Sequence, residues 1–305
     1  MLKKNANLKR ELDSWYDKIC TKNFIDKDPV QFPRRYSKRE DVEIAAFLAA
    51  TIAWGRRDLI LRSANKMFAI MGKSPYDYII SGGYKNLKKQ NIHRTFFEDD
   101  LKYFCRGFEH CYAKYGNLEK LFASAEKLSE KYINHELVPA VRTRTRTCGT
   151  HTNEKEELET KVRGFRAVRG KNSYIIDNSN IWQGIALFRE EMAKANKGKF
   201  SKHISNPGPE DRNGSACKRL NLALRWLVRK GPVDLGLWKS LKTSALFIPL
   251  DVHVARTARE LGLTSRNAND KKSVMEITEK LREFCPEDPV KYDYALFGIG
   301  IEKNK

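Results

Sequence analysis

Apolar residues recur at helical spacing over most of this 305-residue chain, and few segments show the period-two alternation of a half-buried strand. This pattern predicts an all-α fold. Residues 40–54 are rich in Ala and apolar on nearly all sides, which is typical of a central helix buried by its neighbours. The predicted helices cover residues 8–22, 40–54, 58–71, 95–114, 118–132, 181–197, 217–229, 252–261 and 272–284, and the apolar stretch 292–301 closes the chain.

Capping residues and glycines mark the expected ends of the early helices. Ser37, followed by Glu40, resembles a capping box in front of the central helix. Gly55 is expected to end that helix. Gly72 is expected to end the helix over 58–71, and the segment SPYDYII behind it is interpreted as a turn.

Residues 138–179 differ in character from the rest of the chain. They mix charged residues, Thr and Gly with little helical periodicity, so we expect an inserted, exposed and partly disordered basic segment. Its arginines could contact DNA as a flexible arm. A solvated insertion with no specific role explains the same composition equally well.

The charge balance points to a polyanionic partner. The chain has 58 Lys and Arg residues against 38 Asp and Glu, a formal net charge of +20. Each basic side chain that meets a phosphate releases a condensed counterion, so nucleic acid is the leading candidate partner. The alternative is that the basic balance only aids solubility.

Several function classes are disfavoured by what the sequence lacks. No apolar run approaches the roughly 18 residues of a membrane helix, and the basic start MLKKNANLKR has no apolar core behind it, so we expect no membrane partner and a cytoplasmic location. The six cysteines form no CxxC pair, which argues against a zinc knuckle, an iron–sulfur cluster or a disulfide framework. No metal or organic cofactor is expected.

Two segments carry candidate chemistry. In NPGPEDRNGSACKRLN, a turn-rich stretch opens into a helix whose first turn contains Lys218. In LFIPLDVHVARTARELGL, an apolar stretch ends on Asp251 at the expected N-cap of the next helix. A lysine amine can attack the sugar C1′ of a nucleotide and form a Schiff base, and a nearby carboxylate stabilises the positive charge that develops. Taken alone, each residue is explained equally by a solvated Lys or a simple helix cap.

Together these segments resemble the helix-hairpin-helix DNA glycosylases, the superfamily of endonuclease III and the archaeal 8-oxoguanine glycosylases. A glycine-containing hairpin there precedes a helix that carries the catalytic Lys, with an Asn three residues later, and Lys218 and Asn221 match that pair. The superfamily motif Asp-x-His-Val-x-Arg is matched by Asp251, His253, Val254 and Arg256. At finer grain, FIDKDPV, AATIAWG, SACKRLN, PLDVHV and DPVKYDYALFGIG resemble DUF2400, an uncharacterised bacterial family related to these glycosylases.

The resemblance implies a two-lobed helix-hairpin-helix fold with DNA across the cleft. Residues 37–229 would form a helical barrel lobe that contains the hairpin, and residues 1–36 with 230–305 the second lobe. It implies a monomeric DNA repair glycosylase with abasic-site lyase activity that acts on an oxidised base in double-stranded DNA, such as 8-oxoguanine. Lys218 would form the Schiff base and Asp251 would assist. The alternatives are a DNA- or RNA-binding protein of the same fold without turnover, and a monofunctional glycosylase that uses Asp251 and water.

Further residues are expected to contact the DNA or the extruded base. The helix start and the neighbouring Arg219 are expected to favour the neutral amine of Lys218. Trp54 is expected in the core, and His253 either orients Asp251 or is a partly buried histidine. The expected DNA contacts are the amides of Gly214 and Ser215 together with Arg219, Asn221, His253, Arg256, Arg56 and Arg57. Trp226, Trp238 and Tyr294 either line a base pocket or pack in the core.

Overall fold

The computed structural model describes residues 2–125, 179–209 and 213–303, and in them it is mostly helical, which confirms the all-α class. The predictions for residues 138–178 and the end of the helix predicted over 118–132 lie outside the described residues, although residues 118–125 are helical. The helices are α1 (Leu2–Ile19), α2 (Lys22–Ile25), α3 (Arg39–Thr51), α4 (Arg57–Met71), α5 (Pro75–Ile80), α6 (Glu98–Tyr115), α9 (Ser179–Lys194), α10 (Lys218–Val228), α11 (Val252–Glu260), α12 (Lys271–Phe284) and α13 (Tyr292–Glu302).

Short elements connect these helices. Strands β1 (Asn91–His93) and β2 (Phe96–Phe97) form a small antiparallel hairpin between α5 and α6. The 3₁₀ turns are η1 (Pro29–Gln31), η2 (Pro33–Arg35), η3 (Gly83–Asn86), η4 (Thr243–Ala245) and η5 (Pro289–Lys291). Within the described part of the chain, no helix is both long enough and apolar enough to cross a membrane.

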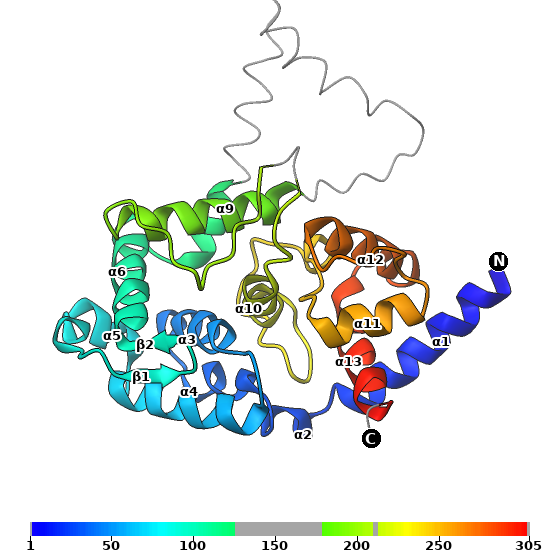
Figure 1. The fold of residues 1–305 in the computed structure, drawn as a ribbon, viewed down its shortest axis with the longest axis horizontal. Coiled ribbons are helices and arrows are strands. Elements are labelled where there is room, and N and C mark those ends of the chain that lie inside the picture. Colours follow the sequence, from blue (N-terminus) through cyan, green and yellow to red (C-terminus); the bar gives the residue numbers. More distant parts are fainter. Residues whose placement is uncertain (1, 126–178, 210–212, 304–305) are drawn as a thin grey trace, which may run out of the picture.

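The helices gather in two groups with α10 between them (Figure 1). One group contains α3 to α6 and α9, in which α6 packs on α9. The other contains α1 and α11 to α13, in which α1 and α11 both pack on α13. Because α10 packs on α3 and also lies beside the second group, its residues are placed to face both.

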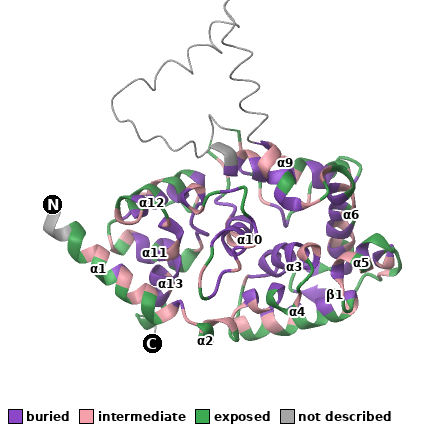
Figure 2. Ribbon diagram, turned by 180° about the vertical axis from the view of Figure 1, so that it is seen from behind, coloured by how far each residue is buried: buried purple, intermediate pink, exposed green. Residues whose placement is uncertain are grey.

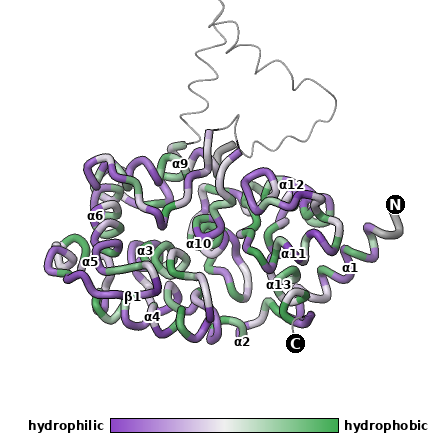
Figure 3. The backbone as a smooth tube through the Cα atoms, viewed as in Figure 1, coloured by the Kyte–Doolittle hydropathy of each residue, from purple (hydrophilic) through white to green (hydrophobic). Residues whose placement is uncertain are grey.

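Helix α3 is the buried centre of the first group, as its sequence predicts. Nearly all of its residues are buried, and the same holds for the inner sides of α10 and α13 (Figure 2). The hydropathy of the chain follows this burial, since hydrophobic residues run along α3 and α13 while hydrophilic residues dominate the outer turns (Figure 3). Four alanines of α3 are fully buried and permit the close approach of α10: Ala45, Ala46, Ala49 and Ala50.

Four local predictions were wrong. Lys38 rather than Ser37 precedes α3, and it makes no side-chain cap. SPYDYII forms the short helix α5, because Ser74 caps it and Pro75 is preorganised for a first helical turn. The helix predicted from residue 95 begins at Glu98, since the β1–β2 hairpin occupies the preceding residues. Gly72 ends α4 at a positive φ of 71°, as predicted, but α3 already ends at Thr51, before Gly55.

A buried ion network fixes α10 to the second group. Arg225 pairs with Asp234 at 3.3 Å and with Asp293 of α13. Arg229 pairs with Asp234 at 2.7 Å and with Asp288 at 2.9 Å. Buried charges are tolerated only when they are paired and hydrogen-bonded, so this network fixes the position of α10 relative to α13.

Candidate active site

A cavity of about 1380 Å³ opens where α10 meets the first turns of α4 and α11 and the length of α13. Ligand pockets commonly measure about 300–1,000 Å³, so the space is large enough for a nucleotide-sized group. Both predicted catalytic residues contribute to its wall. The predicted residues that line it are Lys218, Asp251, His253, Arg56, Arg57 and Tyr294.

The structure brings Lys218 and Asp251 together although 33 positions separate them. The Lys218 Nζ atom lies 3.3 Å from Oδ2 of Asp251 and donates a hydrogen bond of 3.3 Å to the carbonyl of Ala53. Lys218 is the first residue of α10, and Cys217 before it turns the chain at a φ of 46°. About a quarter to a third of each of the two paired side chains is exposed, so the pair is reachable from the cavity.

Asp251 is held by its own helix. It is the N-cap of α11, as predicted, and Oδ1 accepts hydrogen bonds of 2.9 Å from the backbone amides of His253 and Val254. Oδ2 is left to face Lys218. The preceding Pro249 and Leu250 are buried on the cavity wall, so one side of the carboxylate faces a low-dielectric surface.

Trp54 packs against the core, as predicted, but it is only half-buried and also lines the cavity. Its carbonyl lies 3.0 Å from Nε2 of His93, and its ring stacks on His203 with ring centroids 5.7 Å apart. Burial lowers the pKa of His93. The Arg219 guanidinium lies 5.0 Å from the Trp54 ring and donates to the carbonyl of Thr51. Arg219 therefore helps to hold Trp54 in place on the cavity wall.

Three arginines flank the cavity entrance. Arg56 is exposed and paired with Asp58, whereas the Arg57 guanidinium lies 4.5 Å from the ring of Phe297. Arg94, in the turn of the β1–β2 hairpin, was missed by the sequence analysis. Its side chain lies so close over Gly55 that a Cβ there would be 2.5 Å from Nη1. Arg94 is exposed and has no carboxylate partner among the described residues, which leaves its charge available to a ligand.

The loop before α10, which the sequence resemblance identifies as the glycine-containing hairpin, does not present free amides at Gly214 and Ser215. Gly214 N–H donates to the side chain of Asn213, and Ser215 N–H donates to the carbonyl of Asn206 at 2.9 Å. The prediction that these amides bind phosphate was therefore wrong, because the loop uses them internally. Gly214 is required for packing, since a Cβ there would lie 2.0 Å from the carbonyl oxygen of Pro207.

Asn221 is also unavailable for DNA contact. It is buried in α10, and its side-chain amide donates to the carbonyl of Ala216 at 3.0 Å. On α11, the His253 side chain is exposed at the cavity, and it is the backbone of His253, not its ring, that orients Asp251. Arg256 is exposed one turn further on and lies 4.0 Å from Glu260.

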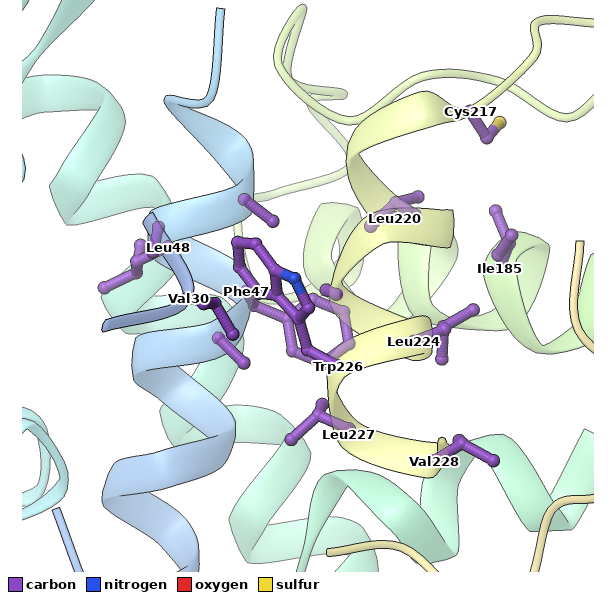
Figure 4. Close-up of a cluster of buried hydrophobic side chains, with 14 of the residues drawn as sticks. Val30, Phe47, Leu48, Ile185, Cys217, Leu220, Leu224, Trp226, Leu227 and Val228 are labelled. Carbon is purple, nitrogen blue, oxygen red and sulfur yellow. The ribbon is translucent and has the colours of Figure 1, made fainter. Parts of the chain in front are cut away.

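Two of the three predicted pocket aromatics belong to the core. Trp226 is fully buried between α3 and α10 near Phe47 (Figure 4). Trp238 is equally buried, and its indole N–H donates to Glu43 at 2.8 Å. Of the two alternatives, a base pocket or the core, the structure therefore places Trp226 and Trp238 in the core. Tyr294 lines the cavity, but its hydroxyl donates to Asp234 at 2.8 Å, which fixes the ring in the wall.

Asp293 lines the same cavity and was missed by the sequence analysis. The residue is 8% exposed, its Oδ2 pairs with Arg225, and its Oδ1 has no hydrogen-bond partner among the described residues. Burial raises the pKa of Asp293 to about 7, the nearby Arg225 opposes this shift, and Asp251 adds to it. One signal was available: Asp293 is the single charged residue in the apolar stretch YDYALFGIGI.

The described residues hold no cluster of three or more His, Cys, Asp or Glu side chains suited to a metal ion.

The comparisons with known proteins identify a family. No curated protein and no solved structure matches the chain. One family model, described as "Protein of unknown function (DUF2400)", matches it in two overlapping segments, residues 28–164 and 145–302. These segments cover most of the sequence, and the chain therefore belongs to the DUF2400 family.

Proposed function

We propose that this protein is a DNA glycosylase with abasic-site lyase activity and a helix-hairpin-helix glycosylase-like fold. The observation that carries the proposal is the Lys218–Asp251 pair, 3.3 Å apart on the wall of a cavity large enough for a nucleotide. The two residues come from the segments whose motifs resemble that superfamily. Both are held by regular structure, Lys218 by the start of α10 and Asp251 by the cap of α11.

The pair supplies the two groups that the reaction requires. Once deprotonated, the Lys218 amine attacks C1′ of the damaged nucleotide, and the base departs with the electrons of the glycosidic bond. The fixed negative charge of Asp251 stabilises the positive charge that develops on the sugar, and the apolar wall beside it strengthens that interaction. Ring opening leaves a protonated Schiff base on Lys218, from which strand cleavage follows.

The entrance of the cavity suits a phosphate backbone. Arg94 is exposed and unpaired within the described residues, and together with Arg56 and Arg57 it forms the rim of this entrance. Trp54 gives this wall a flat aromatic surface. A duplex laid across the rim would place a nucleotide extruded from the helix beside Lys218, which is how enzymes reach a base that stacking would otherwise hide.

Borohydride trapping on a duplex with one abasic site tests the proposal. Reduction converts the Schiff base into a stable covalent adduct, so the full-length wild-type protein should give one and Lys218→Ala should give none. Lys272→Ala is the matched control, because Lys272 also lies in the first turn of a helix and is exposed, but away from the cavity. Failure of the wild type to form an adduct, with salt-sensitive binding to the same duplex, would establish a non-catalytic binding protein instead.

Asp251→Asn separates the carboxylate's charge from its structural role. Asn can still accept the two backbone hydrogen bonds that cap α11, so the fold should persist while the charge beside Lys218 is lost. We expect excision from a panel of duplexes carrying single oxidised bases, 8-oxoguanine included, to fall at least 100-fold with duplex affinity nearly unchanged. An unchanged excision rate would remove Asp251 from the mechanism.

A further inference from the structure

The Lys218 ammonium needs a group that accepts its proton, and Asp251 alone does not meet this need. The amine forms an ion pair with Asp251, so it must lose a proton before it can attack. Asp251 is needed in its charged form to stabilise the sugar, and its Oδ1 already accepts two backbone hydrogen bonds. A second group on the cavity wall that can take a proton and later return it would meet both requirements.

Asp293 has the geometry of that group. It lies in the wall of the cavity that holds Lys218 and Asp251, and its Oδ1 is buried without a partner among the described residues. Arg225 holds the other oxygen, so the carboxyl is fixed in place. Burying a polar atom without a partner is costly, and here the unpartnered atom belongs to a carboxyl in the wall of the cavity, so Oδ1 is free to accept a proton or a hydrogen bond there.

The charges around Asp293 come from three elements. Arg225 and Lys218 face it from α10, Asp251 from the start of α11, and Asp234 from the loop that follows α10. Lys218, Asp251 and Asp293 line the same cavity, so the three side chains face a common space. Burial raises the pKa of Asp293 to about 7, so it exchanges a proton readily near neutral pH.

We infer that Asp293 is a third catalytic residue of this site, which takes a proton from the Lys218 ammonium and delivers it to the group that leaves C1′. The inference rests on the proposed function. In base excision, the leaving group is the base nitrogen, which receives the proton as the glycosidic bond breaks. At an abasic site it is the C1′ hydroxyl, which departs as water. Of the three ammonium protons, one goes to the leaving group by way of Asp293. In both reactions the sugar ring then opens, so the second proton goes to the ring oxygen O4′ and the third stays on the Schiff-base nitrogen.

The test is the rate of adduct formation between the full-length protein and an abasic-site duplex, trapped with cyanoborohydride from pH 5.5 to 9. In the wild type, the rate should fall on the acid side with a midpoint near 7, because Asp293 must be ionised to accept the proton. Asp293→Asn should lose this acid limb and react at least about 10-fold more slowly at pH 7.

Asp234→Asn is the matched control. Asp234 also pairs with Arg225 in the buried network, but it does not line the cavity, so its loss should leave the acid limb in place. If Asp293→Asn fails to fold, Asp293→Glu keeps a carboxyl at a displaced position, and it should keep the acid limb with a shifted midpoint.

The outcomes separate the inference from the proposed function. No adduct from the wild type at any pH would refute the proposed function. An adduct with the same rate and pH profile in the wild type and Asp293→Asn, or an unshifted midpoint in Asp293→Glu, would remove Asp293 and leave the proposed function standing. Loss of the limb in Asp234→Asn as well would assign the effect to Arg225, and it would also overturn the role given to Asp293.

Discussion

Glu191 of α9 should stabilise the α6–α9 contact through its charge, and Glu191→Gln measures this contribution. The carboxylate is fully buried and accepts from Lys114 at 3.0 Å, Lys194 at 2.8 Å and His110 at 2.7 Å. Burial acts to raise the pKa of Glu191, but hydrogen bonds from Lys194, His110 and Lys114 outweigh it and lower the pKa to about 2.

The size of the effect follows from that pKa. Lowering a glutamate pKa from 4.5 to about 2 corresponds to at most about 3 kcal/mol of folding free energy. The side chains of His110, Lys114 and Lys194 are between a third and just over a half exposed, so water and salt screen the interaction. We therefore expect Glu191→Gln to lower the free energy of unfolding by about 1–2 kcal/mol at pH 7.

The stabilisation by Glu191 should decrease as the pH falls. Because the folded-state pKa lies below the unfolded one, the stabilisation is fully present above pH 4.5 and is lost as the pH falls toward 2. Urea unfolding should show a difference between the wild type and Glu191→Gln at pH 7 that shrinks between pH 4.5 and 3. Glu190→Gln, on the exposed face of the same helix, is the control. A difference that does not change between pH 6 and 3, or one no larger than that of Glu190→Gln, would refute the reasoning.

Two further changes test the site and the core. If DNA binds at the proposed rim, Arg94→Ala should weaken duplex binding and reduce the slope of log affinity against log salt by about one, whereas Arg106→Ala, exposed on α6, should change neither. An Arg94→Ala slope equal to that of the wild type would place the DNA elsewhere. Trp226→Ala should cost about 3–5 kcal/mol in urea unfolding, because the indole is fully buried between α3 and α10. Unchanged stability with lost DNA affinity would instead assign Trp226 to the binding surface.

The sequence predicts local structure well where one physical signal dominates. Helix α3 is apolar on nearly every side, so its burial follows from composition alone. Asp251 caps α11 because its short side chain reaches the first free amides of its own helix, which needs no tertiary information. The β1–β2 hairpin was missed because its two strands are too short to show an alternating pattern.

The candidate site was only partly predictable. Lys218 and Asp251 stand out through local motifs, and the structure places them 3.3 Å apart. Asn221 and the amide of Ser215 match the same motifs, but packing and loop hydrogen bonds make them unavailable. Trp54 was expected in the core and packs against it, but its place on the cavity wall could not be predicted from the sequence.

What the sequence by itself determined is therefore the helical class, the basic charge and the two segments that carry an amine and a carboxylate. Only the tertiary structure decided which side chains share a cavity. Arg94, Asp293 and Lys218 lie far apart along the chain, and no local pattern relates them. They line one cavity because the buried pair of Arg225 and Asp293 fixes α10 against α13, and because Gly55 leaves room for the Arg94 side chain. The spacing of apolar residues indicates which face of a helix is buried. The position of one helix against another depends on contacts between residues that are distant in sequence.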